Sequence, residues 1–237
     1  MSVQIKTFGN EAVGVITAQR VTFPVLAVPA TYRLYFTWFQ IIVAYILFER
    51  ALWSKRLAFQ NRWALIAILT VILFVLIDRP SIRRIGLGLP TRMGLGVALG
   101  GSLVTVIVLI FLVRWSGGQI PVNPTWPSLH LAWQYVVWAL LQEFILQSFF
   151  FTRCEDLFGS SAAVWVSATL FAAAHLPSPI LMTFTLVAGL FFCEMFRRYR
   201  SIYPIGIVHA MLGLTIAVTM PDSLLHHMRV GIGYLRY

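Results

Sequence analysis

Glu143 is the ionisable residue least readily explained as a surface charge. It lies in the apolar run WALLQEFILQSFFF, and no other Lys, Arg, Asp or Glu occurs between Arg114 and Arg153. A bare carboxylate in the middle of a bilayer is costly unless it is protonated or partnered. The functional interpretation is a general base or a proton-relay carboxylate. The alternative is a neutral glutamic acid that hydrogen-bonds between helices.

Two histidines and two amides accompany this carboxylate. His175 ends one apolar run and His209 lies inside another, while Gln142 and Gln147 share the run of Glu143. Gln147 follows Glu143 by four residues, so on a helix its amide can bond the carboxylate from the same face. A single buried histidine is more often structural than catalytic. Two of them with a buried glutamate in one small bundle favour a site for acid–base chemistry.

The spacing of these residues predicts which of them meet. Glu143 and His175 are each 16 positions from Gly159, in the short connector between their runs. Antiparallel helices rising ~1.5 Å per residue would bring both residues to the same depth, ~24 Å from the turn. His209 is only five residues beyond Pro204. A straight helix places it ~8 Å in, so it is expected to fit this pair less well.

The elements that must position these residues are membrane-spanning helices. Of the 237 residues, 59% are hydrophobic and 11% are charged, against about 25% charged in a typical soluble domain. The mean hydropathy is +0.82. This composition excludes a water-soluble globular protein and a disordered one. The net charge of +10 comes from basic residues between apolar runs, which indicates loops facing anionic headgroups and no nucleic acid binding.

We expect an all-α, polytopic transmembrane helical bundle of about seven to eight spans, because about seven apolar runs approach the length that crosses ~30 Å of hydrocarbon. They cover residues 32–48, 63–77, 93–113, 128–152, 161–176, 180–196 and 203–220. Two connectors, 50–62 and 80–92, mix basic and apolar residues as interfacial helices do. The expected organisation is an N-terminal surface segment (1–31), accessory transmembrane helices (32–79), a core bundle (80–220) and a C-terminal tail (221–237).

Other chemistries find little support in the sequence. Cys154 and Cys193 make neither a disulfide framework nor a metal cluster. The pattern His-Glu-x-x-His is absent, and no serine has a base at motif spacing. Two histidines and one glutamate can bind zinc with an open position, but the spacing does not demand it. No cofactor and no metal are therefore expected.

Three short motifs, in this order, resemble the CPBP family of CAAX proteases, bacteriocin-processing and abortive-infection proteins. That family shows Glu-Glu-x-x-x-Arg, then Phe-x-x-x-His, then His-x-x-x-Asn on a later span. The chain has Gln142-Glu143-Phe-Ile-Leu-Gln147, Phe171-Ala-Ala-Ala-His175 and His209-Ala-Met-Leu-Gly213, within a resemblance over residues 80–220. It departs from the motif at Gln142, Gln147 and Gly213, and the amide of Gln142 has no titratable lone pair to act as a base.

The resemblance implies an intramembrane glutamic-type endopeptidase with no firmly required metal. Glu143 and His175 would activate a water against a peptide carbonyl. His209, with a backbone amide freed at Gly213, would stabilise the oxyanion. The supporting residues would be Gln142, Gln147 and Phe171. The implied partners are membrane lipid and a membrane-associated or C-terminal sorting or lipidated peptide. The compact single bundle fits a bacterial plasma membrane.

Two other functions are compatible with the sequence. One is a catalytically inactive relative that binds a membrane peptide or partner as a scaffold, which the departures at Gln142 and Gly213 favour. The other is a proton-coupled transporter with Glu143 and His175 as a relay. Against the transporter, the sequence has no inverted repeat and no matching pair of broken helices.

Overall fold

The expected all-α membrane architecture is confirmed. The computed structural model describes residues 30–115, 129–220 and 222–236, and within them every element is helical apart from one isolated bridge between Leu87 and Ser201. Six helical stretches there are long and apolar enough to span a membrane. They are α1 (Ala30–Leu52), α2 (Leu57–Asp78), α3 (Arg92–Trp115), the continuous α4 (Leu129–Glu143), η1 (Phe144–Phe151) and α5 (Thr152–Phe158), then α7 (Pro179–Tyr199) and α8 (Ile202–Thr219).

The fifth expected span is the short helix α6 (Ser160–Ala173). Its 14 residues extend only ~21 Å at ~1.5 Å per residue, which is less than the ~30 Å of a hydrocarbon core. The structure therefore has six helices of spanning length and one shorter apolar helix among its described residues. The expected N-terminal surface segment, 1–31, lies outside the described residues except for its last two, which begin α1.

The two expected interfacial helices are wrong. Residues 50–62 are the end of α1, a tight connection and the start of α2. Their mixed composition arises because basic and aromatic side chains gather where two spans reach the membrane surface. Residues 80–92 form turns up to the start of α3. Gly86 there adopts φ +73° and its carbonyl accepts a hydrogen bond from Ile202 N at 3.0 Å, so this connector docks on the start of α8.

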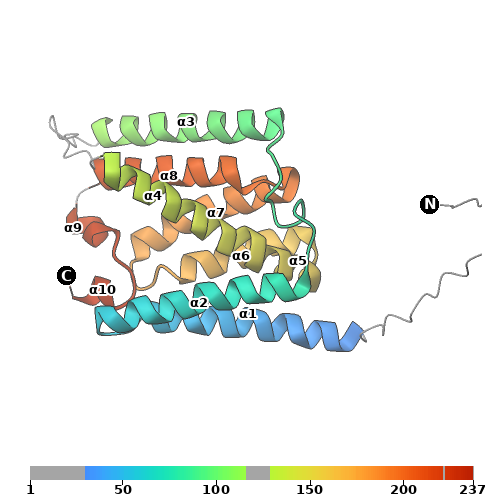
Figure 1. Cartoon of the computed structure of the whole chain (residues 1–237). Coiled ribbons are helices and arrows are strands. Elements are labelled where there is room, and N and C mark those ends of the chain that lie inside the picture. The colour runs from blue at the N-terminus through green and yellow to red at the C-terminus, as the bar shows by residue number, and fades with distance from the viewer. Residues whose placement is uncertain (1–29, 116–128, 221, 237) are drawn as a thin grey trace, which may run out of the picture.

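The helices are arranged around the long stretch α4–η1–α5. Figure 1 shows α1 and α2 side by side along one edge of the bundle, α3 along the opposite edge, and α4 crossing between them. α3 and α4 both pack against α8, while α6 packs against α7. The end of the chain, with α9 (Asp222–Leu225), η2 (His226–Met228) and α10 (Ile232–Leu235), lies at the end of the bundle where α1 turns into α2.

A buried arginine joins α1 and α2 to the rest of the bundle. Arg153 is 5% exposed. Its Nε donates to Oε1 of Gln40 at 2.6 Å and its Nη2 donates to Oδ2 of Asp78 at 2.7 Å. The guanidinium also lies 3.8 Å from the ring centroid of Phe149. A buried charge is tolerated when it is paired and hydrogen-bonded in this way.

Candidate active site

The carboxylate of Glu143 is fully buried and both of its oxygens are engaged. The residue is 0% exposed. Its Oε1 lies 2.7 Å from Nδ1 of His209, and its Oε2 accepts a hydrogen bond from Nε2 of Gln147 at 3.1 Å. The expected bond from Gln147, one helical turn along, is thus present. These two partners compensate for the removal of the carboxylate from water.

A change of helix type occurs at this carboxylate. Glu143 is the last residue of α4, and the π-helix η1 begins at Phe144. Wide π turns are rare and occur frequently at functional sites. Here the wide turn carries the buried Gln147, so the helical irregularity coincides with the polar group that contacts Glu143.

His209 meets Glu143 directly, and the expectation that it fits less well is wrong. The depth of His209 in the bundle also depends on how α8 is offset along the α4–η1–α5 stretch, and a count from Pro204 leaves this offset out. Arg200, just before α8, forms an ion pair with Glu155 of α5. Glu143 lies twelve positions before Glu155 and His209 nine positions after Arg200, or ~18 and ~14 Å along straight helices. Counted from this ion pair, the two residues reach similar depths.

His175 is positioned by the end of α6. Helix α6 ends at Ala173. Pro177 follows four residues later, and because a residue before proline is disfavoured in a helix, Leu176 does not continue α6. The Nδ1 atom of His175 lies 2.7 Å from the carbonyl oxygen of Phe171. A carbonyl only accepts, so Nδ1 carries the proton and Nε2 of the neutral imidazole keeps its lone pair. Within the described part of the chain, no hydrogen bond joins His175 to Glu143.

Both imidazoles line one cavity. Its volume is about 320 Å³ and its walls come from α1, α2, α4, η1, α6, α7, α8 and the end of the chain. His175 and His209 each pack edge-on against the ring of Phe171, at centroid distances of 4.8 and 5.8 Å. Most of the other lining side chains are aliphatic or aromatic: Phe48, Ile68, Trp138, Leu146, Phe150, Phe184, Phe192 and Ile216. A few polar groups in an apolar pocket are typical of a site that orients an apolar ligand.

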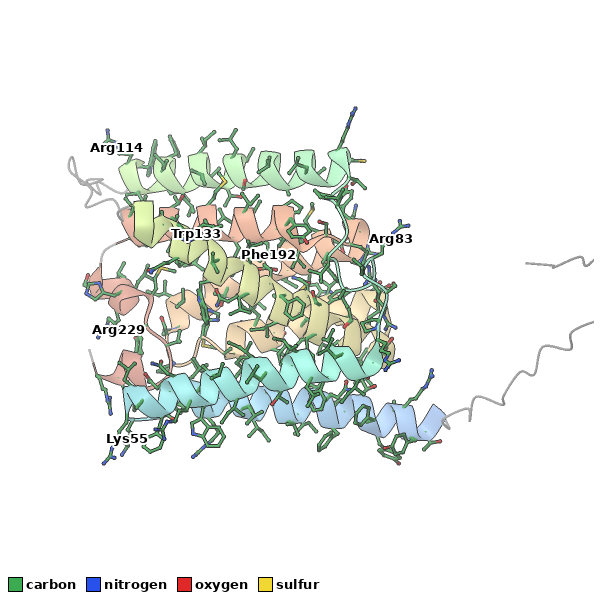
Figure 2. The ribbon with its side chains drawn as sticks, in the orientation of Figure 1. Lys55, Arg83, Arg114, Trp133, Phe192 and Arg229 are labelled. Carbon is green, nitrogen blue, oxygen red and sulfur yellow. The ribbon has the colours of Figure 1, made fainter. Side chains whose placement is uncertain are left out.

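The site lies inside the bundle rather than at its surface. The ring of His209 stacks on Phe192 at a centroid distance of 5.3 Å. Figure 2 shows Phe192 between the end of the bundle that carries Lys55, Arg114 and Arg229 and the opposite end, which carries Arg83. The histidine of the pair is accordingly only 12% exposed. Across the ranges that the structure describes, no three His, Cys, Asp or Glu side chains are grouped to hold a metal ion.

Comparison with known proteins supports the resemblance seen in the motifs. Residues 124–215 match the family model described as Rce1-like, type II CAAX prenyl endopeptidase Rce1-like. Over this segment, which is less than half of the chain, the sequence is similar to the CAAX endopeptidase family that the motifs resemble. The match covers α4, η1, α5, α6, α7 and most of α8, and so includes all three motifs. No curated protein and no solved structure matches the chain.

The first CPBP motif presents its two polar residues to different surroundings. Gln142 lines the cavity, whereas Glu143 does not reach it and is fully buried. Successive residues on a helix point ~100° apart, which separates the two side chains. The cavity wall therefore carries an amide where the CPBP motif has its first glutamate, and the carboxylate lies behind it.

Gly213, at the last position of the third CPBP motif, lies inside the continuous helix α8. Its N–H is used by the helix ladder, so the expectation of a freed backbone amide is wrong. What the glycine provides is space. A Cβ atom at this position would lie 2.0 Å from the hydroxyl oxygen of Tyr135, and Tyr135 also lines the cavity.

Two aromatic residues of this site were not expected from the motifs. Phe192 of α7 stacks on His209, and Tyr135 of α4 occupies the space beside Gly213. Tyr135 was detectable in principle, because Tyr135, Trp138 and Gln142 follow the i, i+3, i+7 spacing of one helical face. Phe192 gave no such signal, since it belongs to a helix without a motif.

Proposed function

We propose that the chain is an intramembrane endopeptidase that hydrolyses a peptide bond of a membrane-associated or C-terminally lipidated substrate in a bacterial plasma membrane. The observation that carries the proposal is the contact between Glu143 and His209 beside a cavity that His175 also lines. A carboxylate bonded to Nδ1 holds an imidazole in the tautomer with Nε2 free, and it stabilises the imidazolium that forms when Nε2 takes a proton. The apolar lining suits a lipid chain or apolar side chain of the substrate.

This proposal gives Glu143 a different role from the one that the motifs imply. Both carboxylate oxygens are already bonded and the residue does not line the cavity. Glu143 therefore acts through His209, as a positioning residue. The general base is Nε2 of His209, and Nε2 of His175, which also keeps its lone pair, accepts a hydrogen bond from the same water.

The hydrolytic step follows from these roles. The water oxygen attacks the carbonyl carbon while one of its protons moves to Nε2 of His209. The same proton then passes from His209 to the departing amide nitrogen as the carbon–nitrogen bond breaks. The two products are a carboxylic acid and an amine, and the imidazole returns to its neutral form.

The test is a cleavage assay on the protein reconstituted in lipid nanodiscs, with a quenched-fluorescent peptide that carries a prenylated cysteine near its C-terminus. We expect wild-type protein to cleave, and His209→Ala, His175→Ala and Glu143→Gln each to lower kcat by about 10²–10⁴-fold. The matched control is Glu194→Gln, which removes a carboxylate bonded to Arg197 at the far end of α7. Wild-type rates in His209→Ala would rule out the proposed base.

The second candidate is a catalytically inactive CPBP protein that binds a membrane peptide. It is favoured by Gln142, since its amide lies on the cavity wall and none of the described residues that line the cavity is a carboxylate. The same nanodiscs separate the two functions. Saturable binding of the peptide with no cleavage by wild type, and equal binding by His209→Ala, would support the inactive binding protein over the peptidase.

A further inference from the structure

The hydroxyl of Tyr135 lies near the proposed base, His209, and has no role assigned to it so far. Tyr135, Trp138 and Gln142 form the face of α4 that lines the cavity. The phenol of Tyr135 reaches α8 at Gly213, where a Cβ atom would lie 2.0 Å from its hydroxyl oxygen and 2.8 Å from Cζ. Any larger residue at 213 would push the ring away, so the glycine and the tyrosine are complementary in shape.

Another hydroxyl of the described cavity wall is already occupied. Thr185 Oγ1 donates to the carbonyl of Leu181 at 2.8 Å. The Tyr135 hydroxyl, in contrast, makes no hydrogen bond to the residues that the structure describes. Tyrosine hydroxyls that enter apolar surroundings usually find a partner, and a ligand in the cavity is the partner available here.

The place of this hydroxyl relative to His209 decides what it can do. Gly213 follows His209 by four residues, which is one helical turn, or ~6 Å along α8. A hydroxyl held against Gly213 therefore lies about one turn from the imidazole, on a wall that both residues share. A carbonyl whose carbon is attacked by water at His209 can direct its oxygen to this donor.

We infer that Tyr135 donates a hydrogen bond to the carbonyl oxygen of the scissile bond and stabilises the negative charge that develops there. The inference rests on the proposed peptidase function. A donor aimed at the developing oxyanion in a dry site is worth about 10²–10³ in kcat. Tyr135 thereby supplies from α4 a polar group that Gly213 on α8 lacks.

The first test is Tyr135→Phe, which keeps the ring against Gly213 and removes only the hydroxyl. We expect kcat to fall about 10²–10³-fold with KM changed by less than about threefold, because the lost bond strengthens in the transition state. The matched control is Tyr203→Phe, which removes a hydroxyl bonded to the carbonyl of Leu87 outside the cavity. It should retain wild-type kcat.

The second test moves the donor to the opposite helix. Tyr135→Ala vacates the space beside residue 213, and Gly213→Asn added to it places an amide there. We expect this double variant to regain at least about tenfold in kcat over Tyr135→Ala, whereas Gly213→Asn alone, with the ring still in place, loses activity.

The outcomes distinguish this inference from the function on which it rests. Wild-type kcat in Tyr135→Phe, while His209→Ala is inactive, overturns the role of Tyr135 and leaves the peptidase standing. The double variant also overturns it if its unfolding temperature equals that of Tyr135→Ala, which shows that it is folded, and its kcat is no higher than that of Tyr135→Ala. Wild-type protein that cleaves no peptide overturns both.

Discussion

Glu143 of α4 and His209 of α8 meet through Oε1 and Nδ1 at 2.7 Å, with the carboxylate fully buried and the imidazole on the cavity wall. This contact joins two helices that are far apart in the sequence. The two residues have different roles, because His209 reaches the cavity and Glu143 does not. The chemistry of the site therefore belongs to the pair.

The pair should behave as one unit in kinetics. Each of Glu143→Gln and His209→Ala is expected to lower kcat by about 10²–10⁴-fold. Because both changes disable the same base, the kcat of the double variant should be no more than about tenfold lower than the kcat of the less active single variant. Multiplicative losses in the cleavage assay would show that the two residues act independently.

Gln147 should matter for stability as well as for activity. Gln147→Met removes the donor to Oε2 of Glu143 and leaves a buried carboxylate oxygen without its partner. We expect a loss of about 1–3 kcal/mol in the free energy of unfolding, measured by denaturant titration in mild detergent. The control is Gln60→Met in α2, whose side chain is half-buried and makes no hydrogen bond to another described residue. Equal stabilities of the two variants would contradict the role of Gln147.

Arg153 should be the basic residue whose loss destabilises the bundle most. Arg153→Met leaves Gln40 and Asp78 without their donor at the joint of α1, α2 and α5. The buried Gln40 amide then lacks its donor while Asp78, at 36% exposure, can still be hydrated, so we expect a loss of about 1–3 kcal/mol. The exposed pair of Arg84 and Asp156, at 43% and 50% exposure, is worth about 0–1 kcal/mol, so Arg84→Met is the control. The free energies of unfolding of both variants check this difference.

We expect residues 228–235 to close one side of the cavity, and we expect this closure to require glycine at position 231. Its N–H donates to the carbonyl of Leu176 at 2.7 Å, and a Cβ atom would lie 2.3 Å from the carbonyl oxygen of Leu52. The residue also adopts φ +56°, which strains a side chain by about 1–3 kcal/mol.

We therefore expect Gly231→Val to release this segment, whose Met228 and Val230 line the cavity. Faster hydrogen exchange of the amides of residues 228–235 would show the release. Gly233→Ala is the control, because the nearest atom to its Cβ would be 3.6 Å away. Unchanged exchange in Gly231→Val would mean that the packing against Leu52 is not what holds the segment.

Local properties of the sequence determined the membrane architecture and the identity of the polar residues. Long apolar runs predict spans because each run must find hydrocarbon, and this holds regardless of how the helices pack. The bond between Gln147 and Glu143 was predictable in the same way, since residues four apart share a helical face. The prediction of interfacial helices was wrong because basic and apolar residues mix in the same way in a helix on the membrane surface and at the ends of two spans.

Only the tertiary structure decided which groups meet. The rotation of α4 places Gln142 on the cavity and Glu143 behind it, and the position of α8 brings His209 to the carboxylate. Arg153 is likewise buried by packing with α1 and α2, although its sequence position resembles that of a loop residue. Rotation and offset depend on contacts between distant segments, which hydropathy and short-range spacing do not contain.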